Sequence, residues 1–489
     1  MKKHYFGLLA LAFLMAEPCV AQQLKPGFDL AECTDMLRIA ARFGDSAYVQ
    51  TIPPPANYTS VYRSPVVGLE NMWDLWVSRD NRVAVISVRG TTANSTSWLA
   101  NFYAAMVPAS GELQISETEK FNYRLADNPK AAVHVGWLVS TAFLSKDILP
   151  KLDSCYKNGI KDFIIAGHSQ GGAIAYLLTA HLYSLQRQKV IPADIRFKTY
   201  NSAAPKPGNL YFAYEYEAMT QGGWAYNTVN SADWVPEVPL SVQTVNDFNT
   251  TNPFSNAKAM IGKQKLVRRL ALRHVYNNLS KPSLKAQRNY QKYLGNLASK
   301  SVRKNISGYA APEYYNSNNY VRTGAFVVLL ADSAYYKTYP DSKEKIFIHH
   351  FPAPYLLLAG KLGPAGQPAA PPASAQATAP GGTWELDYIS GSRIAFGGLY
   401  PDRKPVVAFD VENSRISGNT SCNTFNGKLV ADGNKISFAN PLATTRMMCP
   451  GESERAFLDT LKKVNTYAIN GNTLTFIMGD TALMRFVRK

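Results

Sequence analysis

Cysteine and histidine are scarce in this sequence, and long uninterrupted apolar runs are missing. The 489 residues include 5 cysteines and 7 histidines. None of the cysteines form a CxxC pair, the spacing typical of zinc and thiol redox centres. Beyond the N-terminal segment, no stretch reaches the roughly 18 apolar residues that a membrane-spanning helix requires. We therefore expect neither a metal nor an organic cofactor, and no transmembrane helix.

The N-terminus has the pattern of an export signal. Lys2 and Lys3 precede the apolar run YFGLLALAFLMA, and small residues end at Ala21, where a signal peptidase would cut. Loss of residues 1–21 removes both lysines and one glutamate, which leaves 50 basic and 34 acidic residues and a formal charge of +16. We expect a periplasmic, envelope-associated or secreted protein that favours anionic partners.

Four cysteines remain after this cleavage. An oxidising compartment allows them to form disulfides. The simplest pairing joins Cys33 to Cys155 and Cys422 to Cys449. We therefore expect the cysteines to stabilise the fold and to take no part in chemistry.

An Ala/Pro-rich segment without charge, residues 363–382, predicts a linker between two domains, 22–362 and 383–489. In the larger domain, short β-prone runs alternate with helical patterns, which favours a mostly parallel sheet covered on both faces. The β-prone runs are 82–88, 162–166, 196–203 and 225–232, and the clearest helical patterns are 136–152 and 171–186. The larger domain is therefore expected to belong to the α/β class.

The smaller domain has a different pattern. Three turn dipeptides stand between β-prone runs, at residues 432–433, 470–471 and 479–480. Such dipeptides are typical of β-hairpins. Only residues 452–464 show helical spacing. We expect a small β-rich domain of the α+β class.

Ser169 lies in Gly-His-Ser-Gln-Gly between an apolar β-prone run and an apolar helix. This strand–turn–helix setting is the one that a nucleophile elbow requires. Gly167 and Gly171 fit it because a side chain at either position would clash with the tight turn. The pattern predicts that Ser169 is a nucleophile and not merely a residue of a turn.

A serine nucleophile needs a histidine base and an acid that orients this base. In α/β-hydrolases both follow the serine, in the order acid, then histidine. This order excludes the earlier histidines, and His274 is set aside because it lies in a basic helical stretch with no turn signal beside it. His349 or His350 remains as the base, and both stay open on this argument. Asp233, which follows a β-prone run, is the candidate acid, although an ordinary turn aspartate would also fit.

Five segments resemble the class 3 lipases, the fungal-type lipase family of α/β-hydrolases. They are, in order, SVRGTTANSTSWLANF, VHVGW, IAGHSQGGAIA, YNSAAPKPGN and VNSADWVPEVP. The resemblance implies a triad of Ser169, Asp233 and His350, with His349 as the alternative base. His350 is preferred because Tyr355 stands five residues after it, as is usual in the family. The resemblance also implies an oxyanion hole formed by Thr91 and Gln170.

The implied function is cleavage of lipid or other acyl esters by a serine hydrolase of the lipase or phospholipase type. Two alternatives remain open. One is a non-catalytic envelope protein that binds lipid or protein on a hydrolase scaffold. The other is an esterase that acts on a polymer or cell-wall ester. The sequence does not indicate the oligomeric state.

A basic insertion sets this chain apart from the family pattern. The interval from Asp233 to His350 is unusually long, and residues 258–304 contain 13 Lys or Arg and no acidic residue. Leu266, Leu270 and Val275 fall on one face of a helix that basic residues flank. We expect two helices, divided at Pro282, that form a cap over about 256–304. The cap either packs on the hydrolase or docks on an anionic membrane surface, whereas no nucleic-acid module is visible.

Residues 383–489 resemble the META domain family, the HslJ type. The matching segments are TWELDYISG, VVAFDVENSRISGNTSCNTFNGKL, TTRMMCPG and YAINGNTLTF. The resemblance supports a disulfide between Cys422 and Cys449. Because the domain contains no histidine and no cluster of acids or bases, we expect a binding or stabilising role for it.

Overall fold

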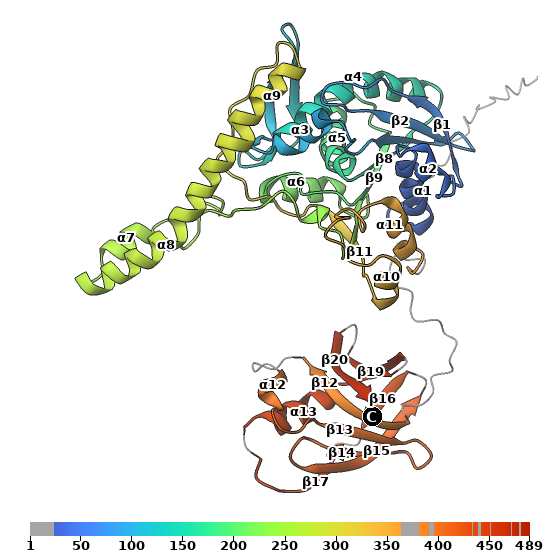
Figure 1. Cartoon of the computed structure of the whole chain (residues 1–489), viewed down its shortest axis with the longest axis vertical. Helices are drawn as coiled ribbons and strands as arrows, with labels where there is room; N and C mark the ends of the chain where they lie inside the picture. Colours follow the sequence, from blue (N-terminus) through green and yellow to red (C-terminus); the bar gives the residue numbers. More distant parts are fainter. Residues whose placement is uncertain are drawn as a thin grey trace, which may run out of the picture. The chain divides into compact units, whose positions relative to one another are not determined.

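The computed structural model describes residues 24–362, 381–390, 396–432, 434–438, 442–449, 451–470, 472–478 and 481–489. The chain divides into two compact units between residues 368 and 369 (Figure 1). The expected signal peptide and residues 363–380 of the expected linker lie outside the described residues. Within the described residues, no helix is both long and apolar enough to cross a lipid bilayer.

A seven-stranded mixed sheet forms the centre of the first unit, in the order β1-β2-β3-β8-β9-β10-β11. The strands from β3 to β11 pair in parallel, and β1 and β2 are antiparallel. They are β1 (Tyr58–Arg63), β2 (Trp73–Ser78), β3 (Val83–Val88), β8 (Asp162–His168), β9 (Arg196–Ser202), β10 (Ala225–Asn230) and β11 (Ala325–Leu329). The mostly parallel α/β sheet is therefore as the sequence predicted.

Alternate residues of the central strands enter two different hydrophobic cores. In β3, Ala84 and Ile86 join the core that contains α4 (Val135–Lys157) and α5 (Gln170–Arg187). Val83 and Val85 point to the opposite core, with α1 (Leu30–Ala41) and α11 (Pro352–Ala359). Because successive strand side chains point to opposite faces, an all-apolar strand implies a sheet covered on both faces.

Shorter elements connect this framework. The helices are α2 (Ser46–Gln50), α3 (Ser95–Phe102), α6 (Leu210–Thr220), η1 (Val235–Glu237) and α10 (Ser333–Thr338). The strands β4 (Met106–Pro108) and β7 (Ala132–His134) form one small antiparallel pair, and β5 (Ser110–Gln114) and β6 (Lys120–Arg124) form another.

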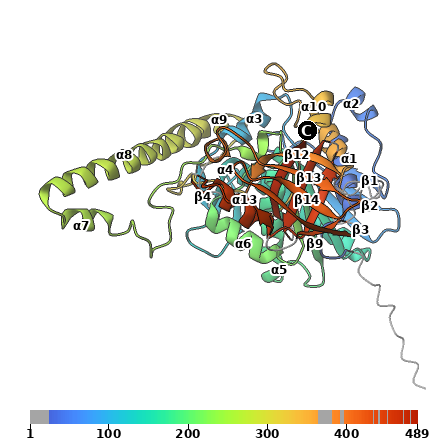
Figure 2. The same cartoon turned by 90° about the horizontal axis from the view of Figure 1, so that it is seen from below.

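The basic insertion does not form the predicted pair of packed helices. After α7 (Ala257–Gly262), helix α8 runs from Leu266 to Gln291 without a break at Pro282, and it continues through a π-helical turn, η2 (Lys292–Leu297), into α9 (Ala298–Asn305). In both views α7 and the first half of α8 extend away from the sheet (Figures 1 and 2). Only the C-terminal part of the insertion packs on the unit, through side chains such as Ser280, Gln287 and Val302. Of the two alternatives for the cap, packing on the hydrolase therefore does not hold for residues 257–279, none of which is buried.

The second unit is a closed antiparallel barrel, which is more regular than the β-rich α+β domain that we expected. Eight strands follow one another in the order β14-β13-β12-β20-β19-β18-β16-β15, and β15 pairs with β14 to close the ring. These strands are β12 (Gly382–Ile389), β13 (Val406–Asp410), β14 (Arg415–Asn419), β15 (Thr424–Asp432), β16 (Lys435–Phe438), β18 (Thr466–Asn470), β19 (Thr473–Met478) and β20 (Thr481–Arg488).

Three antiparallel pairs of the barrel flank the predicted turn dipeptides, namely β15–β16, β18–β19 and β19–β20. The short strand β17 (Ala443–Thr444) adds to β15, and the helices are α12 (Phe396–Leu399) and α13 (Ser453–Leu461). Phe457 and Leu461 of α13 are buried in the barrel core, as the helical spacing indicated.

The cysteines form one disulfide, between Cys422 and Cys449. Cys33 and Cys155 are free and buried, so the pairing that we expected between them is wrong. Cys33 belongs to the core on the α1 face of the sheet, and Cys155 belongs to the core on the α4 face. The sheet separates the two thiols, which a disulfide could join only if their Cα atoms were within about 7 Å.

Candidate active site

Ser169 occupies a strained turn between β8 and α5. Its φ is 62° and its ψ is −132°, a region that non-glycine residues rarely adopt. A Cβ on Gly167 would overlap the backbone of Gly171, and a Cβ on Gly171 would overlap the carbonyl of Val88. Both glycines are therefore required, as the sequence predicted. The turn leaves Ser169 half-buried at the N-terminus of α5, where the helix dipole favours negative charge.

The segment that follows β3 lies against this turn. A Cβ on Gly90 would lie 3.0 Å from the carbonyl oxygen of His168 and 3.5 Å from Cβ of Ser169. Thr91, the next residue, is therefore held beside Ser169. Gln170 is the first residue of α5, and N–H groups in a first helical turn have no acceptor within their helix.

Asn101 of α3 connects these two residues. Its Nδ2 donates to Oγ1 of Thr91 at 3.0 Å, and its Oδ1 accepts from Nε2 of Gln170 at 2.9 Å and from Nε1 of Trp137 at 3.1 Å. Because the Thr91 hydroxyl accepts this hydrogen bond, its own proton remains available to another acceptor. Sequence reasoning missed Asn101, since a single asparagine in a short helix carries no distinctive signal.

Asp233 and His350 are brought together although 117 residues separate them. Nδ1 of His350 lies 2.8 Å from Oδ2 of Asp233. The Tyr355 hydroxyl donates to the same oxygen at 2.7 Å, and the Val235 N–H donates to Oδ1 at 3.0 Å. The Asp233 side chain is fully buried, so these three donors replace the water that it has lost.

Tyr355 therefore has a defined role, because its hydroxyl donates a hydrogen bond to Asp233. Burial raises the pKa of Tyr355 well above its ordinary value, and the charge of Asp233 raises it further. The hydroxyl consequently stays protonated, as a donor to Asp233 must be.

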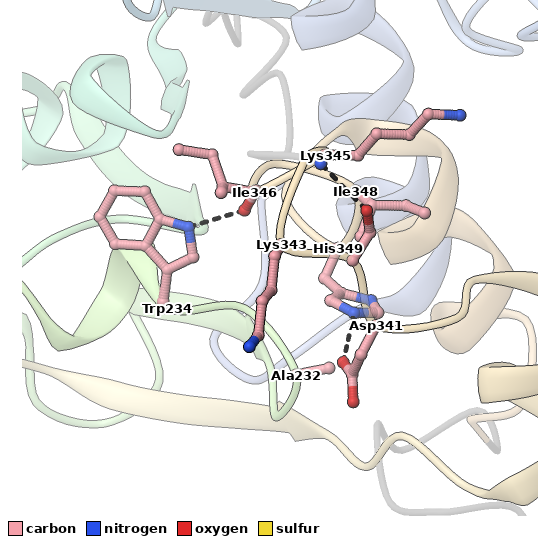
Figure 3. Close-up of a pocket in the computed structure, with 9 residues that line it drawn as sticks. Ala232, Trp234, Asp341, Lys343, Lys345, Ile346, Ile348 and His349 are labelled. Carbon is pink, nitrogen blue, oxygen red and sulfur yellow. Dashed lines mark hydrogen bonds and ion pairs between the residues drawn. The ribbon is translucent and has the colours of Figure 1, made fainter.

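His349 has different partners from its neighbour. Its Nδ1 lies 2.9 Å from the Tyr335 hydroxyl, and its Nε2 lies 3.0 Å from Oδ1 of Asp341 (Figure 3). A neutral imidazole that donates to a carboxylate carries its proton on the bonded nitrogen. The contacts thus favour the Nε2–H tautomer for His349 and the Nδ1–H tautomer for His350. Only His350 then has its Nε2 lone pair left for a nucleophile.

His168, the residue before Ser169, supports the loop that carries His350. Its Nε2 lies 2.7 Å from the His350 carbonyl oxygen, and its Nδ1 lies 2.9 Å from Oγ of Ser202. Burial lowers the pKa of His168 to about 3, with the nearby His350 as the next cause. His168 is therefore neutral near pH 7 and can donate to the carbonyl while it accepts from Ser202. The sequence order excluded it as a base and gave no sign of this role.

Three other histidines that were set aside as bases lie elsewhere. His134 is buried and stacks on Trp137, and His181 is buried against Phe121. His274 is exposed on α8, where it contacts Asn278.

A chain of aromatic rings begins at His350 and reaches the surface. The Phe347 ring centroid lies 5.7 Å from that of His350, 5.4 Å from Trp234 and 6.1 Å from Trp98. Trp98 in turn stacks on Phe102, which is largely exposed. One side of His350 is therefore lined by aromatic rings.

An open cavity of about 440 Å³ lies beside this surface (Figure 3). Its lining includes Trp234, Lys343, Ile346 and His349. The Trp234 indole N–H donates to the Ile346 carbonyl at 2.8 Å, which ties the residue after Asp233 to the loop before His350. The cavity thus adjoins the Asp233–His350 pair from the side of His349.

Two parts of the chain match known protein families. Residues 85–243 match the class 3 lipase family, and residues 376–489 match the META domain family. A secreted mono- and diacylglycerol lipase 1 of Fusarium solani is 28% identical over 178 residues, which cover 36% of this chain and 45% of that protein. A chloroplastic phospholipase A1-Ialpha2 of Arabidopsis thaliana is 27% identical over 175 residues, which cover 32% of this chain and 33% of that protein. The chain thus spans less than half the length of these two relatives.

Solved lipase structures are also similar. The lipase of Rhizopus microsporus var. chinensis matches with a TM-score of 0.32 and 21% identity, over 49% of this chain and 80% of that structure. From the two family matches, the chain carries a class 3 lipase domain, matched over residues 85–243, and a C-terminal META domain, matched over residues 376–489.

Proposed function

We propose that this protein is an exported serine ester hydrolase of the lipase or phospholipase type, with Ser169 as nucleophile, His350 as base and Asp233 as the acid that orients it. The observation that carries the proposal is the 2.8 Å contact between His350 Nδ1 and Asp233. It lies beside an elbow whose serine is held at positive φ. The relatives act on acylglycerols or belong to the phospholipases A1 by name, which supports an acyl ester as the substrate.

In the proposed reaction, Ser169 Oγ attacks the acyl carbonyl carbon while Nε2 of His350 takes its proton. The carbonyl oxygen becomes an oxyanion, which accepts from the backbone N–H groups of Thr91 and Gln170 and from the Thr91 hydroxyl. These donors stabilise charge that exists only near the transition state, and the loss of one typically costs about 3 kcal/mol. Asp233 stabilises the imidazolium that forms.

The tetrahedral intermediate then expels the alcohol, to which His350 returns the proton, and the acyl group stays on Ser169. Water then attacks the acyl carbon while His350 removes its proton, which forms a second oxyanion. This oxyanion collapses, the bond to Ser169 Oγ breaks, His350 returns the proton to Oγ, and the fatty acid leaves. The aromatic rings near His350 would contact the acyl chain and exclude water from it. The reaction needs only these side chains and water.

Labelling with a fluorophosphonate tests the proposal. This probe reacts with an activated serine, so labelling of the wild type should vanish in Ser169→Ala. It should fall at least about a thousandfold in rate in His350→Ala and change little in His349→Ala. Equal losses in the two histidine variants would contradict the assignment of the base.

Hydrolysis assays distinguish the proposed lipid hydrolase from the two alternatives, a non-catalytic binding protein and an esterase that acts on a polymer. Turnover of a short-chain nitrophenyl ester, lost in Ser169→Ala, is expected of the wild type. A wild type that neither labels nor cleaves this ester in detergent would favour a lipid- or protein-binding role. Activity confined to a cell-wall polymer ester would favour the second alternative. A panel of triacylglycerol, phospholipid and polymer substrates therefore assigns the substrate class.

A further inference from the structure

The segment 257–279, comprising α7 and the first half of α8, is a projecting arm, and none of its residues is buried. We refer to it below as the arm. Figure 2 shows α8 extending beyond the rest of its unit. Seven large apolar side chains of the arm are exposed: Met260 (60%), Leu266 (60%), Val267 (82%), Leu270 (56%), Leu272 (38%), Val275 (54%) and Leu279 (74%). So many exposed apolar side chains on one segment are typical of an interaction site.

The charge of the arm has a single sign. Its six basic residues are Lys258, Lys263, Lys265, Arg268, Arg269 and Arg273, and it contains no acidic residue. In helical projection, Leu266, Val267, Leu270 and Val275 share one face, which Arg268, Arg269 and Arg273 border. Apolar residues with basic residues at their margin are typical of helices that lie in the plane of a membrane surface. There the long basic side chains reach the headgroups while their stems stay in the apolar layer.

The root of the arm is fixed to the candidate active site. The Ala105 N–H donates to the Leu294 carbonyl at 3.0 Å, and Thr96 Oγ1 donates to Asn305 Oδ1 at 3.1 Å. Both receiving residues lie C-terminal to the arm, in η2 and α9. Thr96 belongs to α3, which also carries Asn101 and follows the Thr91 segment. A surface bound by the arm would therefore be held at a set position relative to Ser169.

We infer that the arm docks this protein on a lipid surface that carries anionic headgroups. The positive charge of the arm is complementary to the negative charge of such headgroups, and this favours a lipid surface as the partner. A second copy of the chain would bring six positive charges against six, with no acidic group in either arm to neutralise them. Nucleic acid would satisfy the charges and leave the apolar face exposed. The lipid surface satisfies both features, and this docking is independent of whether Ser169 reacts.

The test uses the full chain with Ser169→Ala, so that binding is measured without hydrolysis. Its partition is measured by flotation on vesicles of phosphatidylcholine and on vesicles of equal parts phosphatidylcholine and phosphatidylglycerol. Binding is expected only to the latter and is expected to weaken at high salt. Equal binding to both vesicles, or binding unchanged by salt, would overturn the inference.

Two sets of variants locate the surface. Arg268→Gln/Arg269→Gln/Arg273→Gln should weaken partition about a hundredfold, since each basic side chain contributes about fivefold. Lys25→Gln/Arg187→Gln/Lys189→Gln removes the same charge from exposed positions outside the arm and should change partition by less than about twofold. Equal losses in the two triple variants would show that net charge alone binds the vesicle, and would overturn the role of the arm.

The apolar face is tested separately by Val267→Ser/Leu270→Ser/Val275→Ser. These exposed substitutions should leave the fold intact and weaken partition by more than about tenfold, because apolar surface no longer enters the membrane. Arm-dependent binding to duplex DNA without binding to anionic vesicles would favour nucleic acid, and an arm-dependent dimer in sedimentation without vesicle binding would favour a second copy. Either result overturns the lipid assignment.

In the active chain, the arm variants should keep the turnover of a soluble nitrophenyl ester and lose hydrolysis at anionic vesicles. If the proposed function is wrong, no variant hydrolyses either substrate while the flotation results stand. If the docking is wrong, hydrolysis proceeds and flotation fails. The two proposals can therefore be refuted independently.

Discussion

Removal of the Tyr355 hydroxyl tests how the buried acid is held. Tyr355→Phe keeps the ring in its fully buried place and deletes the donor that lies 2.7 Å from Oδ2 of Asp233. His350 Nδ1 also contacts Oδ2, so the substitution removes one of the two groups that hold this oxygen of Asp233. A hydrogen bond to a charged acceptor contributes about 1.5–3 kcal/mol. We expect the free energy of unfolding of the first unit to fall by about 2 kcal/mol.

The catalytic consequence is expected in kcat. A less firmly held carboxylate orients the imidazole less well and stabilises its charged form less, and both effects act in the transition state. If about 1.4 kcal/mol of the lost energy bears on that state, kcat falls about tenfold with KM unchanged. Hydrolysis of a soluble nitrophenyl ester over a range of concentrations separates the two constants, and chemical denaturation measures the stability.

Tyr335→Phe is the matched control. Tyr335 is also fully buried, and its hydroxyl contacts Nδ1 of His349 at 2.9 Å and accepts from Asn230 at 2.8 Å. The same chemical change should therefore cost a similar amount of stability with little change in kcat. If Tyr335→Phe loses kcat and Tyr355→Phe retains it, the assignment of His350 and Asp233 as the working pair is refuted.

Three further changes test the fold around the site and the barrel. Gly171→Ala should lower the free energy of unfolding by about 3 kcal/mol, measured with denaturant, because the added Cβ would overlap the Val88 carbonyl. Gly262→Ala is the control: a Cβ there has no atom within 4 Å, so the free energy of unfolding should rise by up to about 1 kcal/mol. Equal effects of the two substitutions would refute the packing argument. Burial lowers the pKa of His181 to about 4, so the unfolded chain takes up a proton at higher pH than the folded chain and stability is lost as pH falls from about 6.5 to 4. His181→Leu should abolish about 2 kcal/mol of the loss between pH 7 and pH 5, and parallel pH profiles would contradict this. Reduction of the Cys422–Cys449 disulfide, whose cysteines are 27 residues apart, should destabilise the barrel by about 3.5 kcal/mol, and an unchanged melting temperature would argue against this contribution.

Local pattern was enough to predict the sheet and the elbow. A mostly apolar strand such as 83–88 implies helices on both faces, and the glycines around Ser169 imply a turn that excludes side chains. The pairing of Asp233 with His350 instead needed the resemblance, because two adjacent histidines look equivalent in sequence. The structure distinguishes them through Tyr335 and Asp341, whose contacts depend on tertiary packing.

Other features depended on contacts that no local pattern encodes. Asn101 contacts Gln170 and His168 contacts His350, both far away in the chain, so neither position stood out. The expected thiol pairing failed because it took no account of which face of the sheet each helix covers. Pro282 suggested a helix boundary, yet α8 continues through it. Closure of the barrel required β14 to meet β15, which hairpin turns alone do not specify.

The closed barrel has a consequence for a protein expected to cross a membrane before it folds. A strand at an open sheet edge presents unpaired N–H and C=O groups, and these can recruit strands from other chains into aggregates. Among the strands that the structure describes, each of the eight in the ring pairs with a neighbour on both sides. Once folded, the ring has few unpaired strand edges to which other chains could add. The domain should therefore remain monodisperse when it is produced alone. Its fusion to other proteins should not promote their aggregation.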